Sequence, residues 1–203
     1  MKKLLLIFLV FVTSLSYCQT AEECYKRGMS KDSLKDRRGA IEDFTKAIEL
    51  NPNYSEAYFN RGLSKASLAG RFKFSTNGNG TYYDIALEKT NLEDRRGAIE
   101  DFTKAIELNP NYSEAYFNRG LSKASLANRK RLNSNGTEDT SYDSAFEKAK
   151  LEGYRGAIED YTKAIELNPN YSKAYRERGW SKNELKDKKG ARLDWAKAKE
   201  LEK

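Results

Sequence analysis

The sequence predicts an all-α fold of stacked helical hairpins, and three observations lead to it. The segment 34–69 recurs at 92–127 with a single difference, Lys35 against Glu93, and shorter copies follow at 152–179 and from 187. In each complete copy, apolar residues recur at helical spacing, as Ile41, Phe44 and Ile48 do in the first. All three prolines follow such a segment in an Asn-Pro pair, which ends a helix because proline disfavours the α conformation before it. Repetition at this length is typical of a stacked array.

The expected helices can be placed in order along one copy. Ser55 follows the Asn-Pro turn and can cap the next helix, with Glu56 in its first turn. Small residues such as Gly28 lie where two helices must approach closely. One hairpin cannot bury its apolar stripe alone, so we expect neighbouring hairpins to cover one another. The last copy has Arg192 and Lys199 where the first has Ile41 and Ile48, which suits a terminal cap, although this end is also a candidate self-association face.

These positions resemble the tetratricopeptide repeat, a 34-residue helix–turn–helix unit. The family pattern has a large residue at position 4, Gly at 8, Ala at 20, an aromatic at 24, Ala at 27 and Pro at 32. The first repeat supplies Cys24, Gly28, Ala40, Phe44, Ala47 and Pro52. The chain departs from the pattern at Cys24, and at position 7, where the family usually has Leu and this chain has Arg27, Arg61, Arg119 and Arg178. The resemblance implies a tetratricopeptide-repeat α-solenoid with repeats at 21–54, 55–112 and 113–171 and a capping repeat at 172–203.

Two insertions interrupt the second and third repeats, at 69–92 and 127–151. Each contains a Gly/Asn turn signal followed by a helical stretch, for which Asp84 and Asp143 are candidate caps. We expect both insertions to lengthen their hairpins and to project from the same edge. A β-hairpin is the alternative in the first insertion, because Phe72, Phe74, Tyr82 and Tyr83 flank its Asn-Gly turn. Insertions on one face of a repeat array often mark a binding edge. The second insertion would supply Arg129, Lys130 and Arg131 to such an edge. The alternative is that both insertions are solvated loops.

Residues 1–18 have the layout of a secretory signal peptide. Lys2 and Lys3 precede the apolar run 4–12, and Ser16 and Cys18 stand three and one residues before Gln19. Cleavage there predicts a periplasmic or secreted domain at 19–203, in which Cys24 is a lone, buried cysteine. The alternatives are an uncleaved anchor and a lipoprotein modified at Cys18, since 15–18 resembles a lipobox with Tyr17 in place of a small residue.

The composition argues against an enzyme and against a cofactor or metal site. The chain has no histidine and two cysteines, which removes the commonest general base and the usual zinc and iron–sulfur ligand sets. Ser-Lys pairs recur in every repeat, so we expect them to be structural. The acidic pairs Glu42-Asp43 and Glu100-Asp101 are expected on solvated helix faces, paired with Lys46 and Lys104.

The resemblance implies that the chain binds a peptide or partner protein in a concave groove lined by the first helix of each repeat. Family positions 5, 6 and 9 give the candidate groove residues Tyr25, Met29, Phe59, Asn60, Leu63, Phe117, Asn118, Leu121, Arg176 and Trp180. Such a groove suits an amphipathic helix or an extended apolar segment. The chaperone-binding members carry Lys and Asn where this chain has Tyr25 and Met29, so their ligand is not implied.

The formal charge of +7 is spread over the chain and diluted by acidic residues. Together with export, this argues against a nucleic-acid partner, while contact with an envelope membrane stays open. An alternative function is a self-assembling or lipid-anchored structural element of an envelope complex. The sequence leaves the oligomeric state, the partner and the organism undetermined.

Overall fold

The computed structural model describes residues 18–69, 82–129 and 143–202, with side chains from residue 90 onward in the second range. The described residues form helices and contain no strand. The helices are α2 (Ala21–Ser33), α3 (Arg37–Leu50), α4 (Ser55–Ala69), α5 (Tyr82–Leu108), α6 (Ser113–Ala127), α7 (Ser144–Leu167), α8 (Ser172–Glu184) and α9 (Lys188–Leu201).

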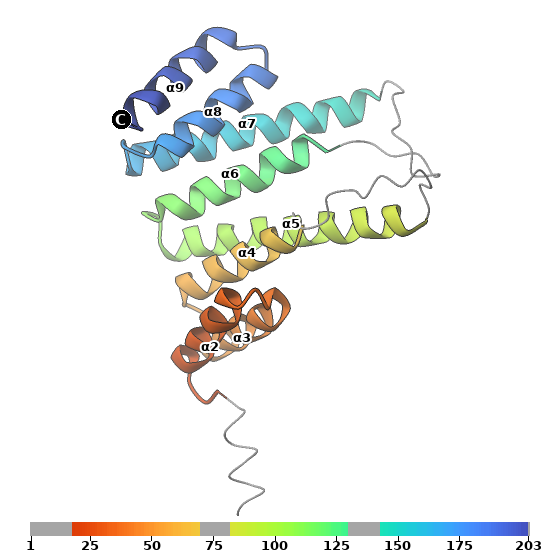
Figure 1. Cartoon of the computed structure of the whole chain (residues 1–203), viewed down its shortest axis with the longest axis vertical. Helices are drawn as coiled ribbons and strands as arrows, with labels where there is room; N and C mark the ends of the chain where they lie inside the picture. Colours follow the sequence, from red (N-terminus) through yellow and green to blue (C-terminus); the bar gives the residue numbers. More distant parts are fainter. Residues whose placement is uncertain (1–17, 70–81, 130–142, 203) are drawn as a thin grey trace, which may run out of the picture.

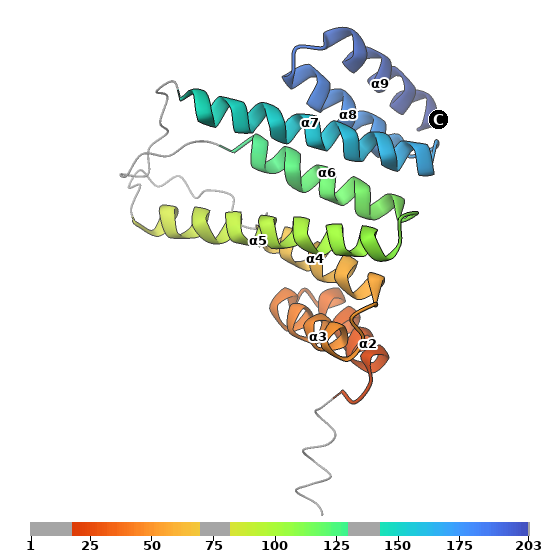
Figure 2. The same cartoon turned by 180° about the vertical axis from the view of Figure 1, so that it is seen from behind.

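Each pair of consecutive helices forms one hairpin, and the hairpins stack in chain order. The closest packing is within the pairs α2–α3, α4–α5, α6–α7 and α8–α9, and each pair also contacts the next. Figures 1 and 2 show this stack from opposite sides, running from α2 at one end to α9 at the other. The predicted all-α solenoid of helical hairpins is confirmed.

The two insertions extend the second helix of their hairpins. α5 and α7 contain 27 and 24 residues, against 14 in both α3 and α9. Figure 1 shows that both extensions project on the same side of the stack, as expected. Asp143 caps α7 by accepting hydrogen bonds from the amides of Ala145 and Phe146, so this predicted cap is confirmed.

In the first insertion, the expected cap and the alternative β-hairpin were both wrong. Asp84 lies inside α5 and does not precede it, because the helix already begins at Tyr82. Tyr82 and Tyr83 are helical, so they do not form the strand of a β-hairpin. Phe72, Phe74 and both Gly/Asn turn signals lie outside the described residues.

A glycine and an aromatic ring meet at the centre of each hairpin. Phe44, Phe102 and Tyr161 are fully buried in the second helices. A Cβ atom added to Gly62 would lie 2.8 Å from Cε1 of Phe102, and Gly28 and Gly120 meet their rings in the same way. The glycine therefore allows the two helices to approach closely enough to enclose the ring.

A buried ion-pair network repeats with the hairpins. Asp101 is only 3% exposed. Its carboxylate accepts hydrogen bonds from Nε and Nη2 of Arg61, at 3.0 and 2.6 Å, and forms an ion pair with Lys65 at 2.8 Å. Nη1 of Arg61 also donates to Thr45 in the preceding repeat, at 3.1 Å. Arg119 and Arg178 make the same two sets of contacts. Each of these arginines therefore joins its own hairpin to the one before it.

This network explains the arginines that depart from the family pattern, and it corrects the expectation for the acidic pairs. Asp43 and Asp101 do not lie on solvated faces but are buried partners of Arg27 and Arg61. Lys46 and Lys104 pair with the acids three residues later, Glu49 and Glu107. The lysines of the recurring Ser-Lys pairs contact the same buried aspartates, in agreement with a structural role.

The buried aspartates in the first and last hairpins, Asp43 and Asp194, should make the protein less stable in acid. Burial alone would raise the pKa of Asp43, but hydrogen bonds from Arg27 and Lys31 outweigh it, so its pKa lies below the ordinary value. The pKa of Asp194 is lowered in the same way by Arg178 and Lys182. In the unfolded chain these carboxyls bind protons more readily, with an aspartate pKa of about 3.9. The stability that they add is therefore complete above that pKa. It is lost as the pH falls through the lower pKa of the folded protein.

We therefore expect the urea concentration at the unfolding midpoint to decrease when the pH is lowered below about 4. This decrease should be smaller in the double variant Asp43→Asn, Asp194→Asn. Circular dichroism from pH 2 to 7 would measure both chains. An equal acid-induced decrease in the two chains would contradict a contribution from these two aspartates.

Candidate protein-binding groove

The first helices of successive repeats, α2, α4, α6 and α8, are neighbours in the stack, and an open pocket of about 370 Å³ lies along α6 and α8. Three of the predicted groove residues, Asn118, Leu121 and Trp180, meet in its wall. Trp180 is 53% exposed, so much of its indole is available for contact. The rest of the wall comes from α4 to α8 and from Asn128 at the end of α6; it consists of Ala66, Arg95, Ser122, Ala124, Ser125, Asn128, Tyr154, Glu177 and Ser181.

Tyr154 also lines this pocket. The residue is 3% exposed, and its buried hydroxyl has no hydrogen-bond partner among the described residues. Burial, reinforced by the negative charge of Glu184, raises the pKa of Tyr154, so the hydroxyl keeps its proton at neutral pH. A buried hydroxyl without a hydrogen-bond partner is costly.

Sequence reasoning missed Tyr154, although the repeats contain a signal for it. In the earlier copies the same position is arginine, Arg37 and Arg95. Arg95 donates to the hydroxyl of Ser125 and to the carbonyl of Ala69, and thereby ties α5 to both neighbouring helices. Glu177 and Trp180 likewise replace Asn118 and Leu121 of the preceding copy. Several differences between otherwise similar copies thus gather around one pocket.

Three of the predicted groove aromatics, Tyr25, Phe59 and Phe117, pack against other rings between helices. Phe117 is 7% exposed, and its ring centroid lies 4.8 Å from that of Tyr171 and 5.8 Å from that of Tyr161. Phe59 stacks at 4.6 Å on Tyr112, and Tyr25 stacks at 4.9 Å on Tyr54. These rings support the joint between repeats, so truncating Phe59 or Phe117 would damage the fold as well as any groove.

The other candidate residues lie on α2, α4 and α8. Met29 is 41% exposed, and Leu63 is half-buried. The amide of Asn60 donates to the hydroxyl of Tyr25 at 3.0 Å. Arg176 pairs with Glu202 at 2.8 Å near the end of the chain. That all of these residues line one groove stays a prediction.

A smaller pocket of about 130 Å³ lies where the extended part of α7 meets the end of α6. The guanidinium of Arg129 lies over the ring of Phe146, 5.4 Å from its centroid, and Arg96 and Lys150 also line the pocket. Lys130 and Arg131, which were expected to extend this basic edge, lie outside the described residues.

The part of the chain that the structure describes contains no group of three or more His, Cys, Asp or Glu residues arranged to hold a metal ion. Within the same residues, no helix combines the length and the apolarity that a bilayer span requires.

Comparison with solved structures places the fold among helical-repeat proteins. A crystal structure of MamA superposes with a TM-score of 0.61 at 21% identity, covering 90% of this chain and 78% of that one. MamA from Desulfovibrio magneticus RS-1 gives 0.61 at 19% identity, covering 90% and 75%. The first tetratricopeptide repeat domain of Spaghetti (RPAP3), bound to an HSP90 peptide, gives 0.53 at 19% identity, covering 82% and 94%. At these identities the likeness shows the fold.

Sequence comparison finds a short match to one protein and identifies the family of this chain. An uncharacterized protein of Methanocaldococcus jannaschii, MJ0572, is 45% identical over 53 residues, which are 26% of this chain and 60% of that protein. Three models described as tetratricopeptide repeat match residues 21–54 and 80–112, 44–71 and 102–131, and 142–200. Together these matches cover most of the chain, which therefore belongs to the tetratricopeptide-repeat family.

Proposed function

We propose that this protein is a non-catalytic interaction scaffold that holds a peptide or partner protein against its first helices, and that the pocket along α6 and α8 is the anchoring point. The observation that carries the proposal is Trp180, which is 53% exposed in the pocket wall and lies there with Asn118 and Leu121. The peptide-bound structure of Spaghetti (RPAP3) has a related fold and supports a polypeptide as the class of ligand.

The pocket wall indicates what kind of side chain would be held. Trp180 offers an exposed apolar face, and a small shift of the Tyr154 ring would bring its buried hydroxyl to an acceptor in the pocket. Arg95 and Glu177 carry opposite charges, so the wall does not favour a ligand of either sign. A side chain with an apolar stem and a neutral acceptor at its tip, such as glutamine, fits these three features.

A selected peptide tests the anchoring point. A peptide chosen from a displayed random library on the purified protein would be titrated, by fluorescence anisotropy, against the wild type and against Trp180→Ala and Tyr154→Phe. We expect about tenfold or greater weakening for Trp180→Ala, since an exposed aromatic at a binding centre often contributes at least 1.4 kcal/mol. Tyr154→Phe should weaken binding by several fold, because it removes one hydrogen bond without changing the ring.

Tyr161→Phe is the matched control for the hydroxyl. The hydroxyl of Tyr161 also has no partner among the described residues, but this residue is fully buried in the core, where the first two repeats have phenylalanine. This change should leave the Kd of the peptide unchanged. Unchanged binding by both Trp180→Ala and Tyr154→Phe would show that this pocket does not anchor the peptide.

We further propose that the scaffold is exported from a bacterial cell and acts in the periplasm or outside the cell. The charged start at Lys2 and Lys3 and the apolar run 4–12 support this proposal. Fractionation of cells that express the full chain would test it, and a chain found only in the cytoplasm would contradict it.

A further inference from the structure

The two cysteines of the chain are joined to each other. Cys18 and Cys24 form a disulfide whose Cα atoms are 5.1 Å apart, and the part of the chain that the structure describes contains no free cysteine. Cys24 was expected to be buried, and it is fully buried. The expectation that it is a lone cysteine differs from this structure, because Cys18, which the expected cleavage before Gln19 would remove, is its partner.

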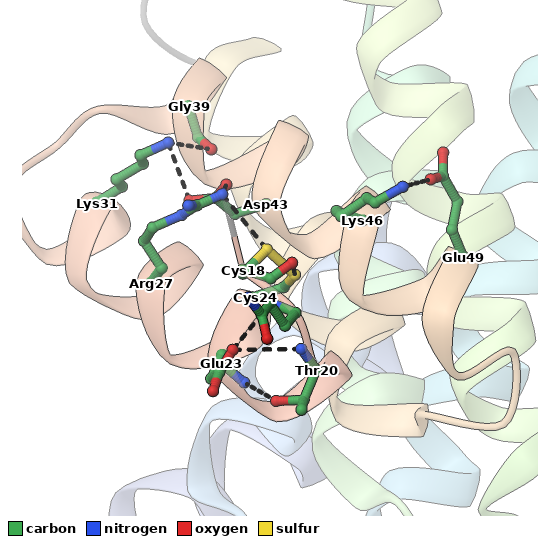
Figure 3. Close-up of a disulfide and its surroundings, with 11 residues drawn as sticks. Cys18, Thr20, Glu23, Cys24, Arg27, Lys31, Gly39, Asp43, Lys46 and Glu49 are labelled. Atoms are coloured by element: carbon green, nitrogen blue, oxygen red, sulfur yellow. Dashed lines mark hydrogen bonds and ion pairs between the residues drawn. A yellow bond between two sulfur atoms is a disulfide. The ribbon is translucent and has the colours of Figure 1, made fainter. Parts of the chain in front are cut away.

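Cys18 is an integrated part of the first repeat. It is 8% exposed and belongs to an apolar cluster with Cys24, Ala47, Ile48 and Ala57. Thr20, two residues after it, caps α2 and forms a reciprocal capping box with Glu23. Figure 3 shows the disulfide between this cap and the ion pair of Arg27 with Asp43.

Arg27 connects the disulfide to the repeating network. In later repeats the equivalent arginines reach back to a threonine of the preceding repeat, as Arg61 does to Thr45. Arg27 stands at the first end of the stack, and its Nη2 lies 3.4 Å from Sγ of Cys18 while it also donates to Asp43. The Cys18 segment thus contacts the guanidinium that elsewhere joins one repeat to the one before it.

From this placement we infer that the exported protein keeps Cys18, held in a disulfide with Cys24 that closes the N-terminal end of the solenoid. Any cleavage of the leader then falls before Cys18, and the sulfur of Cys18 carries no lipid. The inference rests on the proposed export, because disulfides form and persist in oxidising compartments.

The chemistry of one sulfur atom separates the alternatives. A bacterial lipoprotein carries its diacylglyceryl group on the sulfur of its first cysteine as a thioether. A sulfur in that thioether cannot also bond to Sγ of Cys24. Cleavage before Gln19 would likewise remove the disulfide and leave a buried thiol at Cys24.

The disulfide can form by thiol–disulfide exchange with an oxidoreductase of that compartment. The thiolate of one cysteine attacks the disulfide of the oxidant, forms a mixed disulfide and releases the first thiolate of the oxidant. The thiolate of the second cysteine then attacks the mixed disulfide and releases the other thiolate. In total, Cys18 and Cys24 lose two protons and two electrons, and the oxidant becomes a dithiol.

The sequence offers a cleavage position that keeps Cys18. Ser14 and Ser16 stand three and one residues before Tyr17, which is the small-residue spacing of a signal peptidase site. Cleavage there would place the new N-terminus one residue before the disulfide.

Intact mass spectrometry of the full chain, expressed with its own leader and recovered from the periplasm or medium of a bacterial host, tests the inference. We expect a chain that begins at Tyr17, is two hydrogens lighter than its reduced form, takes up no iodoacetamide under denaturing conditions before reduction, and takes up two equivalents after it. As a structural check, reductant should lower the Tm of the wild type to that of Cys18→Ser, Cys24→Ser, whose own Tm should not respond to reductant.

Three results would overturn the inference while leaving export intact: an exported chain that begins at Gln19 and takes up one equivalent without reduction, a chain whose mass includes a diacylglyceryl group at Cys18, or an exported chain with two free thiols. A chain that keeps its leader in the cytoplasm with both thiols reduced would overturn the export proposal and this inference together. Peptide binding at the pocket is measured separately and is not affected by these outcomes.

Discussion

Asp101→Asn is expected to lower the free energy of unfolding by about 3–5 kcal/mol, because breaking a buried ion pair from one side leaves charges without compensation. Asp101 is 3% exposed and is contacted by the guanidinium of Arg61 and the ammonium group of Lys65. The asparagine amide has nearly the same shape but no charge, and its NH₂ group would face donors. Because Arg61 also reaches Thr45, the change should weaken the joint between the first two repeats.

Glu107→Gln is the matched control, since it makes the same chemical change in an exposed pair with Lys104. Exposed pairs contribute about 0–1 kcal/mol, so we expect little change in the urea midpoint. Urea unfolding followed by circular dichroism would measure both variants. A loss below about 1 kcal/mol for Asp101→Asn would mean that the buried network does not stabilise the stack.

The sequence predicted the helical hairpins well because the signals for them are local. The spacing of Ile41, Phe44 and Ile48 and the Asn-Pro ends act within one helix, and the near-identity of 34–69 and 92–127 requires equivalent packing. The start of α5 was less predictable. Asp84 has the chemistry of a cap, but the helix begins two residues earlier, at Tyr82. Local preferences of capping residues are weak compared with the packing of a whole helix.

The ion-pair network was not predictable from spacing within a helix. Glu42-Asp43 looks like a solvated acidic pair when only the four-residue neighbours are considered. The partner of Asp43 is Arg27, sixteen residues away on the other helix of the hairpin. The recurring pairs of Arg27 with Asp43 and Arg61 with Asp101 were present in the sequence, but the packing of two helices was needed to connect them.

The groove was predictable only in part for the same reason. Asn118, Leu121 and Trp180 come from family positions and meet in one pocket. Phe117 has a groove position as well, yet its ring turns into the joint with Tyr171 and Tyr161. The direction in which such a ring packs depends on neighbours from other helices, which the periodicity of a single helix does not contain.

The effect of adding a methyl group at Gly62 is expected to change sign when the facing ring is removed. Phe102→Ala alone should destabilise the protein by about 3–5 kcal/mol, because a fully buried ring leaves a cavity. Gly62→Ala alone should also destabilise it: overpacking against Cε1 of Phe102, 2.8 Å from the new Cβ, costs about 1–3 kcal/mol and exceeds the gain in helix propensity of about 0.8–1 kcal/mol.

In the Phe102→Ala background the clash is absent, so Gly62→Ala should become stabilising by up to about 1 kcal/mol through helix propensity and partial filling of the cavity. A double-mutant cycle measured by urea unfolding tests this reversal. If Phe102→Ala does not fold, Phe102→Leu keeps part of the side-chain volume, and Gly62→Ala should cost less there than in the wild type. An equal loss for Gly62→Ala in both backgrounds would show that something other than this ring excludes a side chain at position 62. The reversal, in contrast, would show that the glycine is required by the ring it faces, and therefore that the repeat pattern records a contact between two helices.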